Sequence, residues 1–216
     1  MAKTKLSLAI LFLFLMLLSL DLGSSVTTNV KTWCVAKPSA RNDSLIANLD
    51  YACSVNPEEC TQLKDDHPCF NPDTTIHHAS FAMNAYYQGM GSHQWNCDFK
   101  DSGLIALTDP SYADCTYSGG DTVLDLSTSG KWCVAKPMTS DDLLQANIDF
   151  ACNHVDCGLI RYGGGCYYPD TLINHASVIM NLYYQANGRE DMSCYFKNTG
   201  CIVMKDPSYD ECKYKF

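Results

Sequence analysis

Two segments of the chain carry a polar stripe that ends in aromatic residues, at the spacing of a helix. In the first segment, Ala79, Met83 and Tyr86 recur at i, i+4 and i+7, an apolar stripe of the kind that faces a core. The polar stripe lies one residue onward. With its copy, it consists of Ser80, Asn84, Tyr87 and Gln88, and of Ser177, Asn181, Tyr184 and Gln185. Pyranose rings present an apolar C–H face that stacks on aromatic rings, and hydroxyls that need amide and hydroxyl partners. The stripe therefore indicates a sugar site, and the alternative is that its side chains satisfy buried backbone groups.

Two further aromatic pairs recur at matching positions. Trp33 and Trp132 each precede a cysteine, and Tyr51 and Phe150 each fall near the end of a predicted helix. A tryptophan beside a disulfide usually packs in a core, while an exposed one could serve as a platform for a sugar ring. Both pairs are therefore candidates for carbohydrate binding, with core packing as the alternative.

The repeated acids do not predict catalysis. A glycosidase needs two carboxyl groups that flank the scissile bond in a cleft. Asp109 and Asp206 precede proline, where aspartate is favoured in turns, and Asp50 and Asp149 fit a structural pair. No cysteine pair has the close CxxC spacing of a zinc site. We therefore expect no catalytic residue, no metal and no cofactor, and the chain has no room for a separate catalytic domain.

These residues belong to two tandem copies of one module. Trp33–Pro38 returns as Trp132–Pro137, and Asp109–Tyr112 returns as Asp206–Tyr209. We expect a first module at 31–117, a linker at 118–130 and a second module at 131–216. The Gly, Ser and Thr content of the linker suggests flexibility, although Val123, Leu124 and Leu126 could dock.

Each copy has the same six cysteines, within a chain total of 13. They are Cys34, Cys53, Cys60, Cys69, Cys97 and Cys115, then Cys133, Cys152, Cys157, Cys166, Cys194 and Cys212. Six cysteines allow fifteen pairings, among which spacing cannot choose. Cys201 lies outside this framework, at the position of Leu104. It is either a buried free thiol or the site of an intermolecular disulfide.

Helical spacing predicts two helices in each copy. Leu45, Leu49 and Ala52 mark the first, which Asn42 or Asp43 could cap. Its counterpart has Ser140 as the cap candidate before Leu144, Ile148 and Ala151. The second helix should run from near Asp73 to Gln88, and its counterpart from near Asp170 to Gln185. Short strands are expected at Leu104–Thr108 and Ile202–Lys205.

The ends and charge of the chain indicate its compartment and exclude some partners. Lys3 and Lys5 precede an apolar run at 6–20 and small residues to Ser25, which predicts a signal peptide at 1–25. Asn42 begins a glycosylation tripeptide, and the C-terminus shows no hydrophobic tail, so we expect a secreted glycoprotein with no membrane anchor. The formal charge of -9 argues against nucleic acid as a partner.

The combined motifs resemble the plant X-eight domain, a cysteine-rich carbohydrate-binding module. They are Trp-Cys-Val-Ala-Lys-Pro, His-Ala-Ser, Tyr-Tyr-Gln and Asp-Pro-Ser-Tyr, in the same order in both copies. The resemblance implies a small disulfide-rich α+β fold, in which each module has two packed helices, a small antiparallel sheet and long coil. It maps the family's helix motif onto Asn84, Tyr86, Tyr87 and Gln88, and onto Asn181, Tyr183, Tyr184 and Gln185.

The resemblance also implies a disulfide pairing and a ligand. The implied bridges are Cys34–Cys97, Cys53–Cys60 and Cys69–Cys115, then Cys133–Cys194, Cys152–Cys157 and Cys166–Cys212. The implied ligand is β-1,3-glucan, hence callose in the plant cell wall. We therefore predict a secreted, non-catalytic, bivalent β-1,3-glucan-binding protein of the apoplast or cell wall. The alternative is a disulfide-rich interaction or defence protein that binds no sugar.

Overall fold

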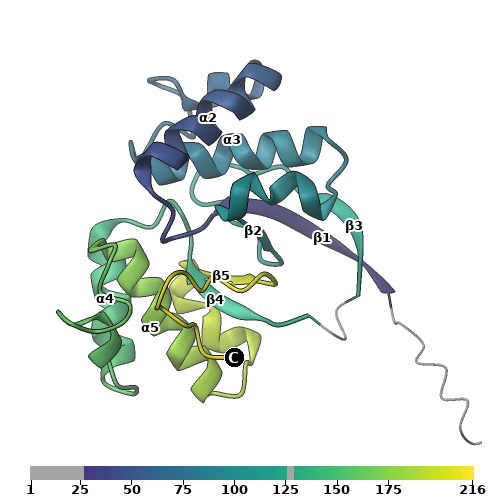
Figure 1. Cartoon of the computed structure of the whole chain (residues 1–216). Helices are drawn as coiled ribbons and strands as arrows, with labels where there is room; N and C mark the ends of the chain where they lie inside the picture. The colour runs from purple at the N-terminus through teal and green to yellow at the C-terminus, as the bar shows by residue number, and fades with distance from the viewer. Residues whose placement is uncertain (1–26, 126–128) are drawn as a thin grey trace, which may run out of the picture.

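The computed structural model describes residues 27–125 and 129–216 (Figure 1). The predicted signal peptide at 1–25 and Leu126 lie outside the described residues. The helices are α2 (Asn42–Val55), α3 (Thr75–Gly89), α4 (Asp141–Cys152) and α5 (Leu172–Ala186). The strands are β1 (Thr27–Ala36), β2 (Gly103–Ala106), β3 (Gly120–Asp125), β4 (Trp132–Ala135) and β5 (Gly200–Val203). Short 3-10 segments lie at Glu59–Leu63, Gln94–Cys97, Phe99–Asp101, Gly158–Ile160, Asp191–Cys194 and Phe196–Asn198.

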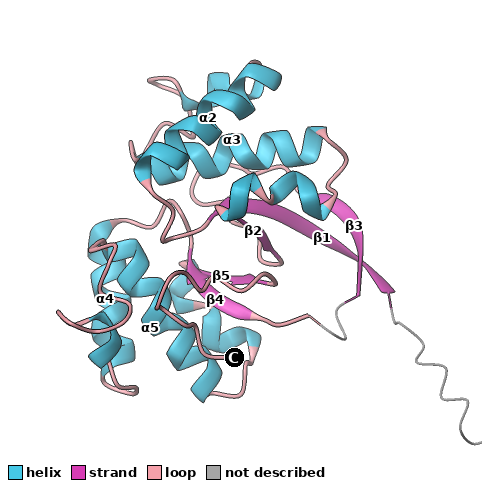
Figure 2. Ribbon diagram, viewed as in Figure 1, coloured by secondary structure: helices cyan, strands magenta, loops and turns pink. Residues whose placement is uncertain are grey.

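The two modules share one antiparallel sheet, in the order β3-β1-β2-β5-β4. Figure 2 shows the strands between two helix pairs, with α2 and α3 above and α4 and α5 below. Each pair packs its helices together, and α3 and α5 also pack on β1 and β4. The predicted disulfide-rich α+β class is confirmed, with two helices per module and short strands joined by long coil.

Equivalent strands of the two modules pair with each other. Ala106 of β2 lies opposite Val203 of β5, and these residues occupy the same position in their repeats. Leu107 N donates to Ile202 O at 2.8 Å, and the equivalent Met204 N donates to Ile105 O at 3.1 Å. Antiparallel pairing of equivalent residues places a local twofold axis between them. The modules are therefore related as the subunits of a C2 dimer are.

In most of the described part of the predicted linker, the docking alternative describes the structure at Leu124, and flexibility does not. Residues Gly120–Asp125 form β3, which pairs in register with Thr27–Thr32 of β1. Leu124 is 1% exposed, whereas Val123 on the opposite face is 67% exposed. The Gly and Thr content of this segment favours a linker, but its side chains alternate between the two faces of the sheet, as they do in a strand. Backbone pairing with β1 stabilises this strand.

All six predicted disulfides are present. The bridges are Cys34–Cys97, Cys53–Cys60, Cys69–Cys115, Cys133–Cys194, Cys152–Cys157 and Cys166–Cys212. The first strand of each module is thereby joined to the 3-10 segment before β2 or β5. A glycine begins each of those strands, because a Cβ at Gly103 or Gly200 would clash with the carbonyl of Cys97 or Cys194.

The helices lie where the spacing predicts them, and Ser140 is at the expected N-cap position, but the expected cap of α2 is wrong. Arg41 occupies the N-cap of α2 without a side-chain bond, and the Asp43 carboxylate accepts from its neighbour Ser44 N instead. Ser140 is the N-cap of α4, again without a side-chain hydrogen bond. The second helices begin two residues later than expected, after the capping hydroxyls of Thr74 and Thr171.

Cys201 lies in a hydrophobic core that both modules build. It is free and 0% exposed, in one cluster with Tyr117, Leu104 and Val203. Its Sγ lies 3.5 Å from Thr108 O, and burial raises the pKa of the thiol to about 12. The structure thus supports the interpretation of Cys201 as a buried free thiol. Its sulfur is not accessible to another chain, so it cannot form an intermolecular disulfide in the folded protein.

Within 27–125 and 129–216, no helix has the length and apolar character needed to cross a bilayer.

Candidate functional site

The polar stripe of α3 lies inside the first module. Ser80 and Tyr87 are 0% exposed and Asn84 is 2% exposed. Ser80 Oγ accepts from Ala36 N at 2.9 Å, and Asn84 Oδ1 accepts from Cys34 N at 3.0 Å. These side chains bond the edge of β1, as the alternative reading of the stripe requires. They offer no ring face or hydroxyl to a ligand outside.

The polar stripe of α5 accepts hydrogen bonds from the backbone of β4 in the same way. Ser177 Oγ accepts from Ala135 N at 3.0 Å, and Asn181 Oδ1 accepts from Cys133 N at 3.1 Å. Tyr184 is 0% exposed, like Tyr87 in the first module. The sugar-site interpretation of both stripes is therefore corrected, since their residues hold the helix to the strand.

Two glutamines of the stripes are only partly buried, but they also bond backbone groups. Gln88 Nε2 donates to Thr32 O and Gln185 Nε2 donates to Lys131 O, both at 2.9 Å. Gln88 and Asn84 line a cavity of about 180 Å³. That volume is below the range of roughly 300–1,000 Å³ typical of small-ligand sites.

The tryptophans before the first cysteines are core residues. Trp33 is 6% exposed and its Nε1 donates to Tyr117 O at 3.2 Å. Trp132 is 8% exposed and its ring lies 5.4 Å from that of Phe216. Neither indole is a platform at the surface, so the core-packing alternative describes both.

Tyr51 and Phe150, by contrast, are surface residues at equivalent positions. They are 52% and 47% exposed on α2 and α4. Tyr51 lies 5.3 Å from Tyr86, which lies 5.5 Å from Phe99, as ring centroids. The second module repeats both distances in its aromatic trio, formed by Phe150, Tyr183 and Phe196. Each module therefore presents one cluster of three aromatic rings beside its first helix.

A groove runs along each aromatic cluster. Its volume is about 500 Å³ in the first module and about 290 Å³ in the second. Five positions line both grooves: Ala47, Asn48, Tyr51, Phe99 and Lys100, and their counterparts Ala146, Asn147, Phe150, Phe196 and Lys197. We call these the α2 groove and the α4 groove. Each combines an aromatic wall with an amide and an ammonium group.

An unusual backbone turn brings the second aromatic and the lysine to each groove. Phe99, Lys100 and Asp101 have φ values of 42°, 54° and 68°, and the equivalents of the second module have 41°, 52° and 71°. Non-glycine residues in this left-handed region cost about 1–2 kcal/mol each. Both modules retain three of them in succession, which sets the direction of Phe99 and Phe196.

The asparagine of each groove is held in place by a hydroxyl. Asn48 Nδ2 donates to Ser102 Oγ at 2.7 Å, and Asn147 Nδ2 donates to Thr199 Oγ1 at 2.8 Å. These bonds fix the side-chain amides between the first helix and the turn after the fifth cysteine. The grooves are therefore built from fixed polar and aromatic groups.

The model of the X8 domain matches residues 32–104 and 131–201. The chain belongs to the X8 domain family. A glucan endo-1,3-beta-glucosidase of Triticum aestivum is 53% identical over 88 residues, which are 41% of this chain and 19% of the glucosidase. The major pollen allergen Ole e 10 of Olea europaea is 45% identical over 86 residues, which are 39% of this chain and 70% of the allergen.

The similarity to the glucosidases covers a small part of their length. A glucan endo-1,3-beta-D-glucosidase of Olea europaea is 46% identical over 87 residues, again 19% of its length. The chain thus spans about a fifth of the glucosidases it matches. All five shared positions of the α2 and α4 grooves lie within the X8 matches.

The sequence does not predict the phenylalanine and the lysine that line the α2 groove and the α4 groove. Phe99-Lys100 returns as Phe196-Lys197, two residues after the fifth cysteine of each copy, and this repetition is the signal that the sequence offers. The left-handed backbone at these residues has no sequence signature, since glycine is absent from the turn. Tyr51 and Phe150 were found, but only the structure separates them from the buried aromatics.

Proposed function

We propose that this X8 protein binds β-1,3-glucan through the α2 and α4 grooves, without catalysis, after secretion to the plant apoplast or cell wall. The observation that carries the proposal is the aromatic trio, with one exposed and two partly buried rings, that recurs at equivalent positions of both modules. The ligand class is supported by the relatives, because two are glucan endo-1,3-beta-glucosidases that share the X8 region.

The grooves have the chemistry that a neutral sugar needs. The half-exposed rings of Tyr51 and Phe150 provide surfaces on which the C–H face of a pyranose can stack. Lys100 and Lys197 supply ammonium groups to hydroxyls. Asn48 and Asn147, whose Nδ2 groups donate inside the protein, offer their amide oxygens as acceptors. The acidic balance of -9 disfavours polyanionic ligands but not a neutral glucan.

The acids of the grooves do not suit hydrolysis. Asp43 is the one acid that lines the α2 groove, and the lining of the α4 groove contains none. Hydrolysis of a glycosidic bond uses two carboxyl groups on opposite sides of it. The grooves therefore support binding.

The proposal is bivalent, and the two grooves are oriented by the twofold axis between Ala106 and Val203. A flexible tether would let both modules follow one chain, but β3 pairs with β1 and the modules share a sheet. A twofold axis reverses the direction of a bound glucan segment that lies across the axis. Segments that lie across it in the two grooves would therefore run in opposite directions.

Co-sedimentation with insoluble β-1,3-glucan tests the function, with cellulose as the control polymer. Tyr51→Ala and Phe150→Ala should each weaken binding at their own groove by about 3- to 10-fold, the value of one aromatic contact. The double variant should lose most of the pelleted protein. Tyr162→Ala is the matched control, because Tyr162 is 85% exposed and lies outside both grooves.

The outcomes separate the site from the function. Selective pelleting that the double variant leaves unchanged would overturn the grooves and keep glucan binding. Failure of the correctly bridged protein to bind either polymer would overturn the carbohydrate function. The protein-interaction alternative would then be favoured.

A further inference from the structure

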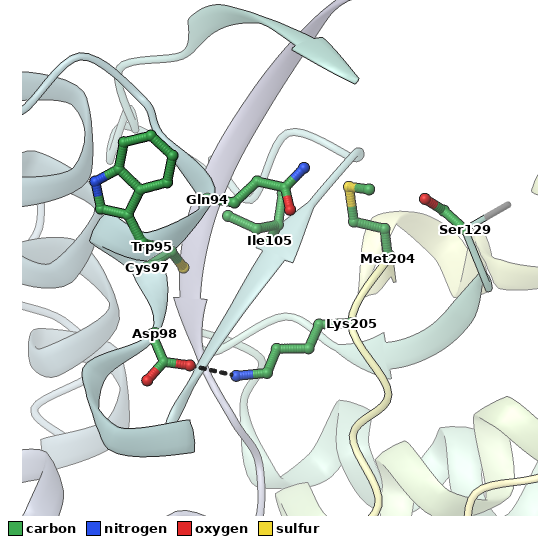
Figure 3. A pocket seen from close by; sticks show the side chains of 8 residues that line it. All are labelled: Gln94, Trp95, Cys97, Asp98, Ile105, Ser129, Met204 and Lys205. Atoms are coloured by element: carbon green, nitrogen blue, oxygen red, sulfur yellow. Dashed lines mark hydrogen bonds and ion pairs between the residues drawn. The ribbon is translucent and has the colours of Figure 1, made fainter. Parts of the chain in front are cut away.

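A further cavity lies where the two modules meet. Its volume is about 530 Å³, and Figure 3 shows Gln94 and Trp95 on one side of it and Met204 on the other. Ile105 and Met204 come from the pairing region of β2 and β5, one from each module. Neither residue falls within the X8 matches, which end at 104 and 201. The cavity therefore depends on module docking and is distinct from the α2 and α4 grooves.

Trp95 gives this junction cavity an aromatic surface. It is 72% exposed, whereas Trp33 and Trp132 are 6% and 8% exposed. His93 stacks on it with centroids 4.4 Å apart and the ring planes 13° from parallel. This stack holds the indole in one orientation before a ligand arrives, which lowers the entropy cost of binding.

The remaining wall is apolar at the bottom and polar at the side. Ile105 is 5% exposed, and Met204 is partly buried beside it. Asp98 and Lys205 form an ion pair of 2.9 Å that joins the two modules, drawn as a dashed line in Figure 3. The hydrogen bond from Lys205 lowers the pKa of Asp98, so the carboxylate stays ionised near neutral pH.

We propose that the junction cavity is a further carbohydrate subsite, for one or two sugar units of a neutral glucan. The C–H face of a pyranose would stack on Trp95, while the carboxylate of Asp98 accepts from one hydroxyl and the ammonium of Lys205 donates to its neighbour. Gln94 offers an amide at the rim. Lys205 also pairs with Asp101 at 2.9 Å, and Asp101 pairs with Lys37 at 3.1 Å. The neutral character of the ligand follows from this network, in which two carboxylates and two ammonium groups leave no net charge for an ion to neutralise. The linkage of the glucan rests on the proposed function, whereas the position and polarity of the site do not.

Intrinsic fluorescence is a direct probe, because Trp95 is the exposed one of the three tryptophans. Soluble β-1,3-linked glucose oligomers should shift the emission to the blue and protect it from iodide quenching. Both effects should persist in the Tyr51→Ala/Phe150→Ala variant, which lacks the groove rings. A control with cellulose-derived oligomers tests the linkage.

Calorimetry gives an independent test. It measures the affinity for the oligomers of further variants made in the Tyr51→Ala/Phe150→Ala protein. Trp95→Ala should weaken oligomer binding by about tenfold, the upper value for one aromatic contact. Lys205→Met should weaken it several-fold, whereas Lys213→Met, an exposed lysine of the same module, should not. Circular dichroism checks that Trp95→Ala folds. Its spectrum should be unchanged, because the side chain is exposed.

Failure of this subsite and failure of the proposed function differ in outcome. Absence of any fluorescence change, with co-sedimentation that needs Tyr51 and Phe150, would overturn the junction subsite alone. Absence of both signals would overturn glucan binding and this subsite's glucan together. Binding in the double variant that Trp95→Ala and Lys205→Met do not weaken would place the residual site elsewhere and overturn the proposal.

Discussion

Ala106 and Val203, which occupy the same position in the two repeats, lie opposite each other in the shared sheet. An unpaired strand edge is a template for association with other chains. Here each module covers the edge of the other, with the bonds of Leu107 N and Met204 N on either side of the pair. The duplication thus produces an internal C2-like interface in place of a dimer.

Cys201 reports on this interface because it lies two residues before Val203. Its thiol is fully buried and its pKa is raised to about 12, so almost no thiolate forms at pH 8. We expect the native protein to resist a thiol reagent at pH 8 and to react at one thiol per chain in guanidinium without reductant. Rapid labelling of the native protein, or a covalent dimer on a non-reducing gel, would contradict the buried position.

Proline substitutions on either side of the twofold axis should open the interface. Leu107→Pro removes the N–H that bonds Ile202 O, and Met204→Pro removes its symmetry equivalent. Each should speed the labelling of Cys201 by tenfold or more, on the basis of about 1.4 kcal/mol or more lost. Leu107→Ala and Met204→Ala are the controls, since they keep the N–H. Equal labelling of the proline and alanine variants would show that these bonds do not hold the modules together.

The sequence predicts the repeats, the four helices and, through the family resemblance, the six bridges. It fails where the outcome depends on which side of a helix meets a strand. The stripe of Asn84 and Tyr87 has the right period for a surface site, but strand β1 needs acceptors for its N–H groups, and Asn84 supplies one. Strand β3 and the twofold pairing depend on contacts between distant segments, which local pattern does not encode.

The two buried tyrosines of the stripes should differ in their contribution to stability. The Tyr87 hydroxyl lies 2.8 Å from Thr32 Oγ1, whereas the Tyr184 hydroxyl has no hydrogen-bond partner among the described residues. Tyr87→Phe should lower the free energy of unfolding by about 1 kcal/mol, the net value of one hydrogen bond. Tyr184→Phe should be neutral or stabilising, because it removes an unpartnered buried hydroxyl. Urea unfolding midpoints measure both, and equal losses would contradict the difference in bonding. Neither variant should change glucan binding.

The lysine before the first proline of each module has a different hydrogen-bond partner in the two modules. Lys37 Nζ bonds Asp101 at 3.1 Å, whereas the equivalent Lys136 Nζ bonds Asn198 at 2.9 Å. Hydrogen bonds from Lys205 and then Lys37 lower the pKa of Asp101 from its ordinary value of 3.8. A lowered carboxyl pKa stabilises the fold above pH 3.8, and this contribution is lost as the pH falls through the folded-state pKa.

Asp101→Asn should therefore destabilise the protein at pH 7 and have little effect near pH 2. Asn198→Asp should stabilise it at pH 7 by about 0.5–1 kcal/mol, or a rise in Tm of about 1–4 °C, and lose this gain in acid. Thermal unfolding at both pH values measures the two changes. Asp101 and Asn198 have similar left-handed φ values of 68° and 71°, so the backbone accepts either residue at either position. Effects of Asp101→Asn that do not depend on pH would contradict an ionic origin.

The twofold relation between the α2 and α4 grooves predicts that the protein links separate glucan chains. A glucan chain has a reducing and a non-reducing end, and segments that lie across the twofold axis in the two grooves have opposite directions. Because the shared sheet fixes the modules, they cannot turn to follow one straight chain. Soluble β-1,3-glucan should become turbid at intermediate protein ratios and clear again in protein excess, when each chain is saturated separately.

Variants with one groove separate linking from binding. The Trp95→Ala background removes the junction subsite, and in it the protein should still cause turbidity through its two grooves. Adding Tyr51→Ala or Phe150→Ala should abolish the turbidity while oligomer binding continues at the remaining groove. Light scattering and calorimetry on the same samples measure the two effects. Turbidity that persists with either single groove would show that linking arises from association of the protein and not from its internal symmetry.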